Sequence, residues 1–275
     1  MTAIQVRGLR KAYGDHLAVD GIDLAVSTGE VFALLGPNGA GKTTTVEILE
    51  GHRRRSGGEV NVLGEDPGAA SRAWRARIGI VLQSAADAGD LTVAEAVRHV
   101  AGLYPRARRV ADAIDLVGLA DKAGARVRTL SGGQRRRLDV ALGIVGFPEL
   151  VFLDEPTTGF DPEARRQFWA LIRALAAEGT TILLTTHYLD EAEALADRLA
   201  VIAGGVIVAE GTPATLGGRA SAGAVVRWGG GQEIRTGDPA AAIAGLAAKG
   251  VDLSGLTVTR PTLEDTYLSL IGAAR

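Results

Sequence analysis

The chain of 275 residues contains no cysteine and one methionine, and aromatic residues make up only 4% of it. Without cysteine there can be no disulfide bonds and no thiolate metal sites, which fits a reducing compartment. No apolar run reaches the roughly 20 residues that span a bilayer, because the most apolar stretch, Val140–Leu153, is interrupted by Pro148 and Glu149. The beginning of the sequence also lacks the apolar segment of a signal peptide. We therefore expect a cytoplasmic protein.

An excess of charge of one sign is also absent. The sequence has 30 lysines and arginines against 32 acidic residues, a formal net charge of −2. No overall basic field would therefore attract nucleic acid. The arginine runs Arg53–Arg55 and Arg135–Arg137 are better explained as solvated faces, and we predict no nucleic-acid partner. The hydrophobic fraction of 47% suffices for one large domain with a small appendage.

Apolar runs of strand length alternate with helical patterns along most of the chain. This alternation is typical of an α/β core around a buried parallel sheet. The predicted core strands are Val31–Leu35, Ile78–Leu82, Leu150–Leu153 and Thr181–Thr185. Two alternating runs, Ile4–Arg7 and Ile22–Val26, predict an antiparallel flank. Between about residues 84 and 146 the pattern is almost wholly helical, which predicts a helical insertion in the core.

Several helix starts are marked by their capping residues. Thr92 and Glu95 form a predicted capping box, and Asp161 followed by Pro162 is the expected start of another helix. After about Gly217 the character of the sequence changes to short alternating pieces and glycine-rich turns, followed by a helix starting at Thr262. The sequence thus predicts a large domain over residues 1–216 and a small α+β domain over residues 217–275.

A glycine-rich stretch, GPNGAGKT, follows the predicted strand Val31–Leu35 and precedes a helical segment. This is the P-loop pattern, in which glycines let backbone N–H groups converge on phosphate oxygens at a helix N-terminus. The alternative is an ordinary glycine turn with a chance lysine, but the strand before and the helix after favour a phosphate site. The predicted ATP-binding residues here are Gly36, Pro37, Asn38, Gly39, Ala40, Gly41, Lys42, Thr43 and Thr44.

The apolar strand Leu150–Leu153 is followed directly by two acids, Asp154 and Glu155. A carboxylate at the end of a strand is how P-loop enzymes place a ligand near Mg²⁺. The second acid could orient and deprotonate a water molecule. Acids also end strands simply because loops are solvated, but the P-loop upstream favours the functional interpretation.

The pentapeptide LSGGQ lies between these two motifs and resembles the signature motif of ABC transporter ATP-binding subunits. Its residues are Leu130, Ser131, Gly132, Gly133 and Gln134. Ser131 and Gln134 also fit a capping box for the following helix. The resemblance implies that the signature contacts the γ-phosphate bound by a second subunit. It also implies a P-loop NTPase core with an antiparallel β flank and a helical signature subdomain.

Further residues follow in the family's order over about Ile4 to Glu210. By resemblance, Tyr13 stacks on adenine, Asp161 belongs to the D-loop at the dimer interface, and His187 contacts the γ-phosphate. Gln83 resembles the glutamine near Mg²⁺ and the transporter contact. The resemblance implies catalytic roles that fall on Glu155, His187 and Gln83, and Mg²⁺ ligands that are Thr43, Gln83 and Asp154.

The final segment, Pro261–Gly272, resembles the carboxyl end of ATPases that serve drug, antibiotic, lipid or polysaccharide exporters. The resemblance implies an ATPase that uses ATP and Mg²⁺, a head-to-tail homodimer of cassettes, and a separate membrane permease on the cytoplasmic face of the cell membrane. Two positions depart from the family pattern. Ser84 follows Gln83 where an acidic–proline stretch is more usual, and Phe160 replaces a commoner leucine. The alternatives are an importer's ATPase and a regulatory ATPase in DNA repair or translation.

Overall fold

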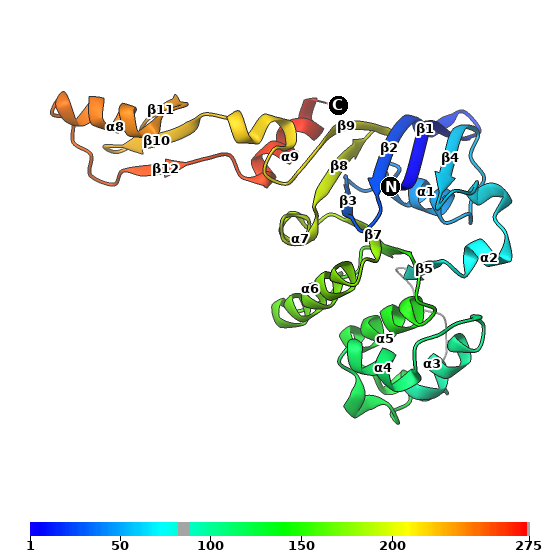
Figure 1. Cartoon of the computed structure of the whole chain (residues 1–275). Helices are drawn as coiled ribbons and strands as arrows, with labels where there is room; N and C mark the ends of the chain where they lie inside the picture. The colour runs from blue at the N-terminus through cyan, green and yellow to red at the C-terminus, as the bar shows by residue number, and fades with distance from the viewer. Residues whose placement is uncertain (82–88, 274–275) are drawn as a thin grey trace.

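The computed structural model of the chain describes residues 1–81 and 89–273. Its centre is a six-stranded sheet of order β5-β6-β7-β3-β8-β9 (Figure 1), in which only the pairing of β8 with β9 is antiparallel. The strands are β3 (Val31–Leu35), β5 (Ile78–Val81), β6 (Leu150–Asp154), β7 (Thr181–Thr186), β8 (Arg198–Ala203) and β9 (Val206–Gly211). The α/β fold and the four predicted core strands are confirmed, although Leu82 lies outside the described residues.

The predicted antiparallel flank is confirmed as a three-stranded sheet of order β2-β1-β4. It comprises β1 (Thr2–Tyr13), β2 (His16–Ser27) and β4 (Gly57–Val62). The first two strands are longer than predicted, because irregular pairing between Val6 and Leu9 breaks the simple alternation of buried and exposed residues.

The central strand β3 is buried on both faces, which explains why its sequence is continuously apolar. Val31, Ala33 and Leu35 point into one hydrophobic core, and Phe32 and Leu34 point into the other. The first core lies toward the helices that follow β5, and the second lies toward the antiparallel flank. Alternation along one strand therefore joins the two cores.

Nine α-helices occur in the described residues, and several begin at the predicted caps. Both capping boxes, at Thr92 and at Ser131, are present. The helices are α1 (Lys42–Leu49), α2 (Arg72–Arg75), α3 (Val93–Ala101), α4 (Val110–Leu116), α5 (Gly132–Ile144), α6 (Pro162–Ala177), α7 (Leu189–Leu195), α8 (Pro239–Ala248) and α9 (Leu263–Ala273). Short 3₁₀ segments cover Pro67–Ala69, Ala120–Lys122, Val127–Thr129 and Leu216–Ser221. None of the helices within residues 1–81 and 89–273 is long and apolar enough to cross a membrane.

Helices α3, α4 and α5 pack on one another and lie together below the central sheet in Figure 1. Helix α5 approaches strand β5 very closely, because both carry a buried glycine at the contact. A Cβ atom on Gly79 would lie 2.2 Å from the carbonyl oxygen of Gly143. No side chain fits at this position without moving the helix away from the sheet.

The C-terminal residues form a third sheet, of order β11-β10-β12, with α8 beside it (Figure 1). Its strands are β10 (Ala224–Trp228), β11 (Gln232–Thr236) and β12 (Thr257–Thr259). The last helix, α9, leaves this sheet and returns to the main body, where it contacts α7, β8 and β9. Leu263 at its start is 1% exposed and belongs to the core that contains Val31, Ala33 and Leu35.

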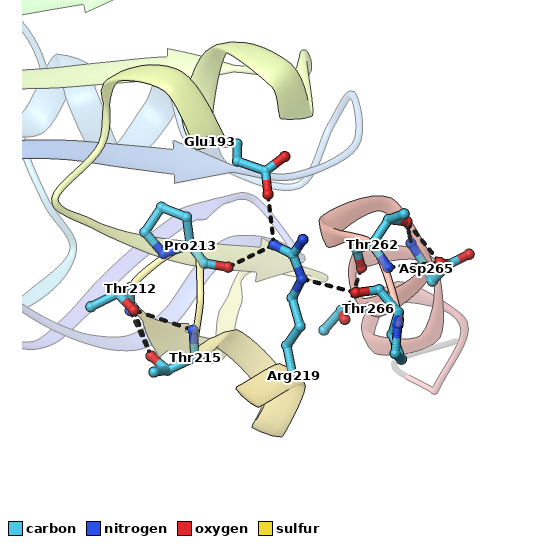
Figure 2. A network of polar contacts seen from close by, with 9 residues as sticks. Glu193, Thr212, Pro213, Thr215, Arg219, Thr262, Asp265 and Thr266 are labelled. Carbon is cyan, nitrogen blue, oxygen red and sulfur yellow. Dashed lines mark hydrogen bonds and ion pairs between the residues drawn. The ribbon is translucent and has the colours of Figure 1, made fainter. Parts of the chain in front are cut away.

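Arg219 links the segment before the third sheet to the main body (Figure 2). It donates hydrogen bonds to the carbonyl oxygens of Pro213 and Pro261, both at 2.9 Å, and it pairs with Glu193 of α7 at 2.8 Å. One guanidinium thus connects the two chain segments that lead into and out of the third sheet with helix α7.

The close approach of β5 and α5 yields a stability prediction. We expect Gly79→Ala to lower the free energy of unfolding by about 1–3 kcal/mol, because the added methyl group overpacks the contact with Gly143. Urea denaturation checks it. Gly124→Ala is the control, since a Cβ atom there meets nothing within 4 Å. Equal stability of the two variants would contradict the tight contact.

Candidate nucleotide-binding site

The predicted functional residues gather at one edge of the central sheet. Strand β7 lies between β6 and β3, and all three are parallel. The register pairs Leu35 with Thr186 and Asp154 with Thr185. The carboxyl ends of the three strands are therefore level, and the loops that follow them meet at the same place.

The P-loop needs glycine where neighbouring backbone comes close. A Cβ atom on Gly36 would lie 2.4 Å from the carbonyl oxygen of Ile202. Gly41 has a φ of 104°, and a Cβ atom there would lie 2.5 Å from the carbonyl oxygen of Ala18. The loop is thus fitted tightly between β8 and β2, and it leads directly into α1.

Lys42 is the first residue of α1 and is only 6% exposed. Its Nζ donates to the carbonyl oxygens of Gly36 at 2.7 Å and Pro37 at 3.2 Å. Burial lowers the pKa of Lys42, whereas the nearby carboxylates of Glu155 and Asp154 raise it. A buried ammonium held by neutral carbonyl oxygens is well placed to bind the anionic oxygens of a phosphate group.

A cavity of about 520 Å³ opens over this loop and brings together residues from distant parts of the chain. Its lining residues are Tyr13, His16, Ala18, Asn38, Gly39, Gly41, Lys42, Thr43, Thr44 and Glu155. The structure thus collects much of the predicted P-loop set, Tyr13 and Glu155 around one volume. His16 and Ala18 also line the cavity, although no motif in the sequence marks them, because the hairpin after Tyr13 brings them toward the loop.

The two acids after β6 lie in different environments. Thr185 Oγ1 donates to Asp154 Oδ1 at 2.5 Å. Glu155 has a φ of 44°, a left-handed conformation that is strained for a residue other than glycine. Its side chain contacts His187, with 3.3 Å between Oε1 and Nδ1. Glu155 and His187, which were predicted separately as catalytic residues, are therefore in direct contact.

Tyr13 is 41% exposed and lies beside two cationic side chains. Lys11 Nζ and Arg53 Cζ lie 5.0 and 5.4 Å from the centroid of its ring. Neither cation is among the described residues that line the cavity. They therefore hold the ring from outside while the ring itself borders the cavity.

The signature residues Leu130–Gln134 lie elsewhere on this chain, since none of them is among the described residues lining the cavity. Ser131 is exposed and caps α5, with Gln134 N donating to Ser131 Oγ at 3.3 Å. Asp161 caps α6 through bonds from the N–H groups of Glu163 and Ala164, at 2.9 and 2.8 Å. Gln83 lies outside the described residues.

One interpretation of the sequence is wrong. Arg135–Arg137 is not a uniformly solvated face, because Arg136 is buried at 8% exposure. Successive helical residues point about 100° apart, so a run of three cannot share one solvated side. Arg136 donates to the backbone beside Glu155, through Nη2 to Asp154 O at 2.6 Å and Nε to Pro156 O at 3.1 Å.

The donors available for Mg²⁺ are oxygen atoms. Thr43, which carries a hydroxyl, is one of the residues that line the cavity, and Asp154 ends β6, the strand next to β7. Mg²⁺ keeps several water molecules and takes only one or two protein oxygens when phosphates are present. The hydroxyl and the carboxylate therefore fit this ion. Within the described residues there is no group of three or more His, Asp or Glu side chains that could form a metal site by itself.

A second cavity of about 520 Å³ lies between the end of α1, strand β5 and the helices α3 and α5. Its lining residues are Glu50, Gly51, His52, Arg75, Ile78, Ile80, Val100, Tyr104, Leu142 and Gly143. Glu50 is 5% exposed, and its Oε2 lies 3.2 Å from His52 Nδ1. Burial, with smaller contributions from Asp154 and Glu47, raises the pKa of Glu50 to about 8. At neutral pH this contact is therefore a hydrogen bond of a protonated carboxyl.

The fold and the site define a P-loop nucleotide-binding protein. A family model described as ABC transporter matches residues 19–158, about half of the chain. The chain belongs to the ABC transporter family.

Two relatives are similar to this chain over a longer segment than the family model matches. The daunorubicin/doxorubicin resistance ATP-binding protein of Streptomyces peucetius is 48% identical over 219 residues, which cover 78% of this chain and 66% of that protein. The Nod factor export ATP-binding protein I of Cupriavidus metallidurans is 46% identical over 223 residues, which cover 78% of this chain and 73% of that protein. The chain spans about two thirds of the length of the first relative and somewhat more of the second.

Solved structures confirm the fold. An ATP-binding subunit of an ABC transporter has a TM-score of 0.74 at 22% identity, and the likeness covers 98% of this chain and 99% of that one. A dimeric ATP-binding cassette in a post-hydrolysis state, bound to ADP and phosphate, has a TM-score of 0.69 at 22% identity and covers 76% of this chain and 98% of that one.

Protonation of Glu50 yields a pH-dependent prediction. Its carboxyl has a pKa of about 8 in the folded chain, against the ordinary value of 4.5 that applies to the unfolded chain. At a pH between these two values the unfolded chain has released a proton that the folded chain keeps. Stability from this group therefore falls as pH rises. We expect the difference in unfolding free energy between Glu50→Gln and the parent to increase by roughly 1–3 kcal/mol, in favour of the variant, as the pH rises from 5 to 8.

Urea denaturation at several pH values measures this gain. Glu264→Gln, at an exposed position of α9, controls for the loss of one carboxylate. A difference between Glu50→Gln and the parent that stays flat with pH would show that Glu50 is ionised throughout.

Proposed function

We propose that this chain is the ATP-binding and ATP-hydrolysing subunit that powers an ABC-type exporter of the drug, antibiotic, lipid or polysaccharide class. The observation that carries the proposal is the convergence of the P-loop, Glu155 and Tyr13 on one cavity, with His187 in contact with Glu155. Such a site would bind the base of a nucleoside triphosphate at Tyr13 and its phosphates at the P-loop, with Glu155 as the general base beside the γ-phosphate.

In this proposal ATP lies along the cavity from Tyr13 to Lys42. Adenine stacks on the open face of Tyr13, and the P-loop N–H groups bind the β- and γ-phosphates. Lys42 turns from the carbonyl oxygens of Gly36 and Pro37 to the phosphate oxygens. Thr43 and Asp154 would hold Mg²⁺, with Gln83 as a further ligand, and the ion would neutralise charge on the phosphate oxygens when bound.

Glu155 orients the attacking water in the hydrolysis step. Its carboxylate accepts a hydrogen bond from the water and takes its proton as the water oxygen bonds to the γ-phosphorus and the bond to the leaving oxygen of ADP breaks. His187 would hold the carboxylate through their 3.3 Å contact and would contact the γ-phosphate, as its place in the family pattern implies. The products are ADP and inorganic phosphate.

A second copy of the chain completes each site. Ser131 is exposed at the N-terminus of α5, where backbone N–H groups favour an anion, and the signature does not reach the described lining of its own cavity. In a head-to-tail homodimer the signature of one copy, residues 130–134, would bind the γ-phosphate held by the other, with Asp161 near the interface. ATP thus favours the closed pair, and hydrolysis releases it.

The membrane partner is a separate permease, which holds this chain at the cytoplasmic face of the cell membrane. The two relatives support export, because one is named for drug resistance and the other for Nod factor export. An importer ATPase and a regulatory ATPase in DNA repair or translation are the less favoured alternatives. The first 216 residues would act as the motor, and residues 217–275 would form an accessory unit.

The role of Glu155 gives the central test. We expect Glu155→Gln to bind ATP with little change in affinity but to lose at least about a hundredfold in turnover, because the amide cannot accept the water's proton. The variant should accumulate as a dimer when ATP is added, which gel filtration with light scattering measures. Glu163→Gln, on the exposed start of α6, is the control. Turnover at the parent rate would remove Glu155 from this role.

The P-loop lysine gives a second test, directed at binding. We expect Lys42→Ala to weaken ATP affinity by about tenfold or more, because a buried cation that faces the phosphates is removed. Titration with a fluorescent ATP analogue measures the affinity. Lys249→Ala, at the exposed end of α8, should bind as the parent does. If Lys42→Ala also binds as the parent does, the cavity over the P-loop is not the triphosphate site.

A further inference from the structure

The buried guanidinium of Arg136 joins two motifs that act on different ATP molecules in the proposed dimer. Arg136 lies in the first turn and a half of α5, two positions after Gln134 of the signature. It donates to the carbonyl oxygens of Asp154, at 2.6 Å, and of Pro156, at 3.1 Å. These two residues flank Glu155 on either side, so the guanidinium clamps the backbone of the proposed base.

The burial of Arg136 is energetically unfavourable unless its charge is compensated by nearby groups. Arginine is rarely buried unless it is paired, and removing a charge from water is unfavourable without compensating partners. Among the described residues, two backbone carbonyls and the charges of Asp139, Asp154 and Glu191 contribute to the compensation around Arg136. The guanidinium is therefore fixed in one geometry, and its planar fork sets the spacing of the two carbonyl groups.

The clamp acts where the backbone is strained. Glu155 holds a left-handed φ of 44°, a conformation that persists only when its surroundings enforce it. On the side of β7, Glu155 N donates to Thr185 O and Thr185 Oγ1, both at 3.1 Å. On the side of α5, Arg136 binds the carbonyls on either side of Glu155. Contacts from two elements thus determine where the carboxylate points.

We propose that Arg136 is a positioning residue that couples the signature helix to the catalytic carboxylate of the same chain. This inference rests on the proposed function. Ser131 at the N-terminus of α5 contacts the ATP held by the partner, and Glu155 acts on the ATP held by its own chain. A shift of α5 when the signature engages phosphate is carried through Arg136 to the backbone from Asp154 to Pro156. Hydrolysis in one site then depends on occupancy of the other.

Substitution of Arg136 tests the positioning role. We expect Arg136→Met to lower kcat by roughly ten- to a hundredfold, the effect of a small misplacement of a catalytic group. The ATP affinity and KM should stay within about twofold, since Arg136 contacts no described residue of the P-loop in this geometry. Arg136→Lys should recover much of kcat because an ammonium can still donate to carbonyl oxygens. Arg137→Met is the control, since Arg137 contacts Gln167 of α6 instead.

Thermal unfolding shows whether Arg136→Met folds; if it does not, Arg136→Lys and Arg136→Gln carry the test. A kcat within twofold of the parent in the folded variants would overturn the positioning role. A raised KM with unchanged kcat would overturn it too, because Arg136 would then serve nucleotide binding. If the parent shows no ATP hydrolysis, or Glu155→Gln forms no ATP-dependent dimer, the proposed function itself fails instead.

A double-mutant cycle tests the coupling. We expect Ser131→Ala to slow turnover in the parent and to have a clearly smaller effect in the Arg136→Met background, because both changes interrupt one connection. Fully additive effects on kcat would show that Arg136 and the signature act separately. In that case the coupling is wrong.

Discussion

The parallel pairing of β3, β6 and β7 is the constraint on which the site depends. The register of these strands brings the P-loop, the acids after β6 and the histidine after β7 to one level. Residues separated by more than a hundred positions in sequence therefore meet over one cavity. The strands can hold this register because they are buried on both faces, with one hydrophobic core on each side of β3. A slip of one residue would exchange the two sets of side chains between cores.

The site is assembled at the cost of local strain and of buried charge. Glu155 adopts a left-handed backbone, and Lys42 and Arg136 are both nearly buried cations. These features are unfavourable when taken singly. Together they compensate one another, because the two cations lie near the carboxylates of Asp154 and, for Lys42, Glu155. A region with this much electrostatic interdependence is sensitive to small displacements, which the coupling proposed for Arg136 requires.

Much of the fold was predictable because periodicity and capping follow from local physics. The core strands, the boxes at Thr92 and Ser131 and the cap at Asp161 were found in this way. The extent of β1 and β2 was not, because glycines with positive φ such as Gly8 and Gly21 break the alternation inside each strand. The hairpin of β8 and β9 is not among the predicted elements, although the glycine pair Gly204–Gly205 between two apolar runs is a turn signal.

The site was predictable to a different degree. Motifs such as the P-loop are contiguous in sequence, so their spacing alone identifies their residues and the chemistry that these residues can perform. His16 and Arg136 could not be found in this way, since their significance lies in what the fold places beside them. A run of three arginines shows no difference among its members until the helix axis is fixed. Only then does Arg136 face the backbone of the strand end while Arg137 faces α6.

The return of α9 to the main body connects the C-terminal residues to elements near the site. Helix α7 follows directly after His187 and Tyr188, and it receives both the apolar contact of α9 and the ion pair between Glu193 and Arg219. The segments on either side of the third sheet therefore contact α7, the helix that follows β7 at the site. Loss of residues 217–275 would remove Leu263, expose the apolar side chains that it covers and leave Glu193 of α7 without Arg219. The C-terminal residues are therefore connected to the site through the contacts of α9 and Arg219 with α7, and not only through the continuous backbone.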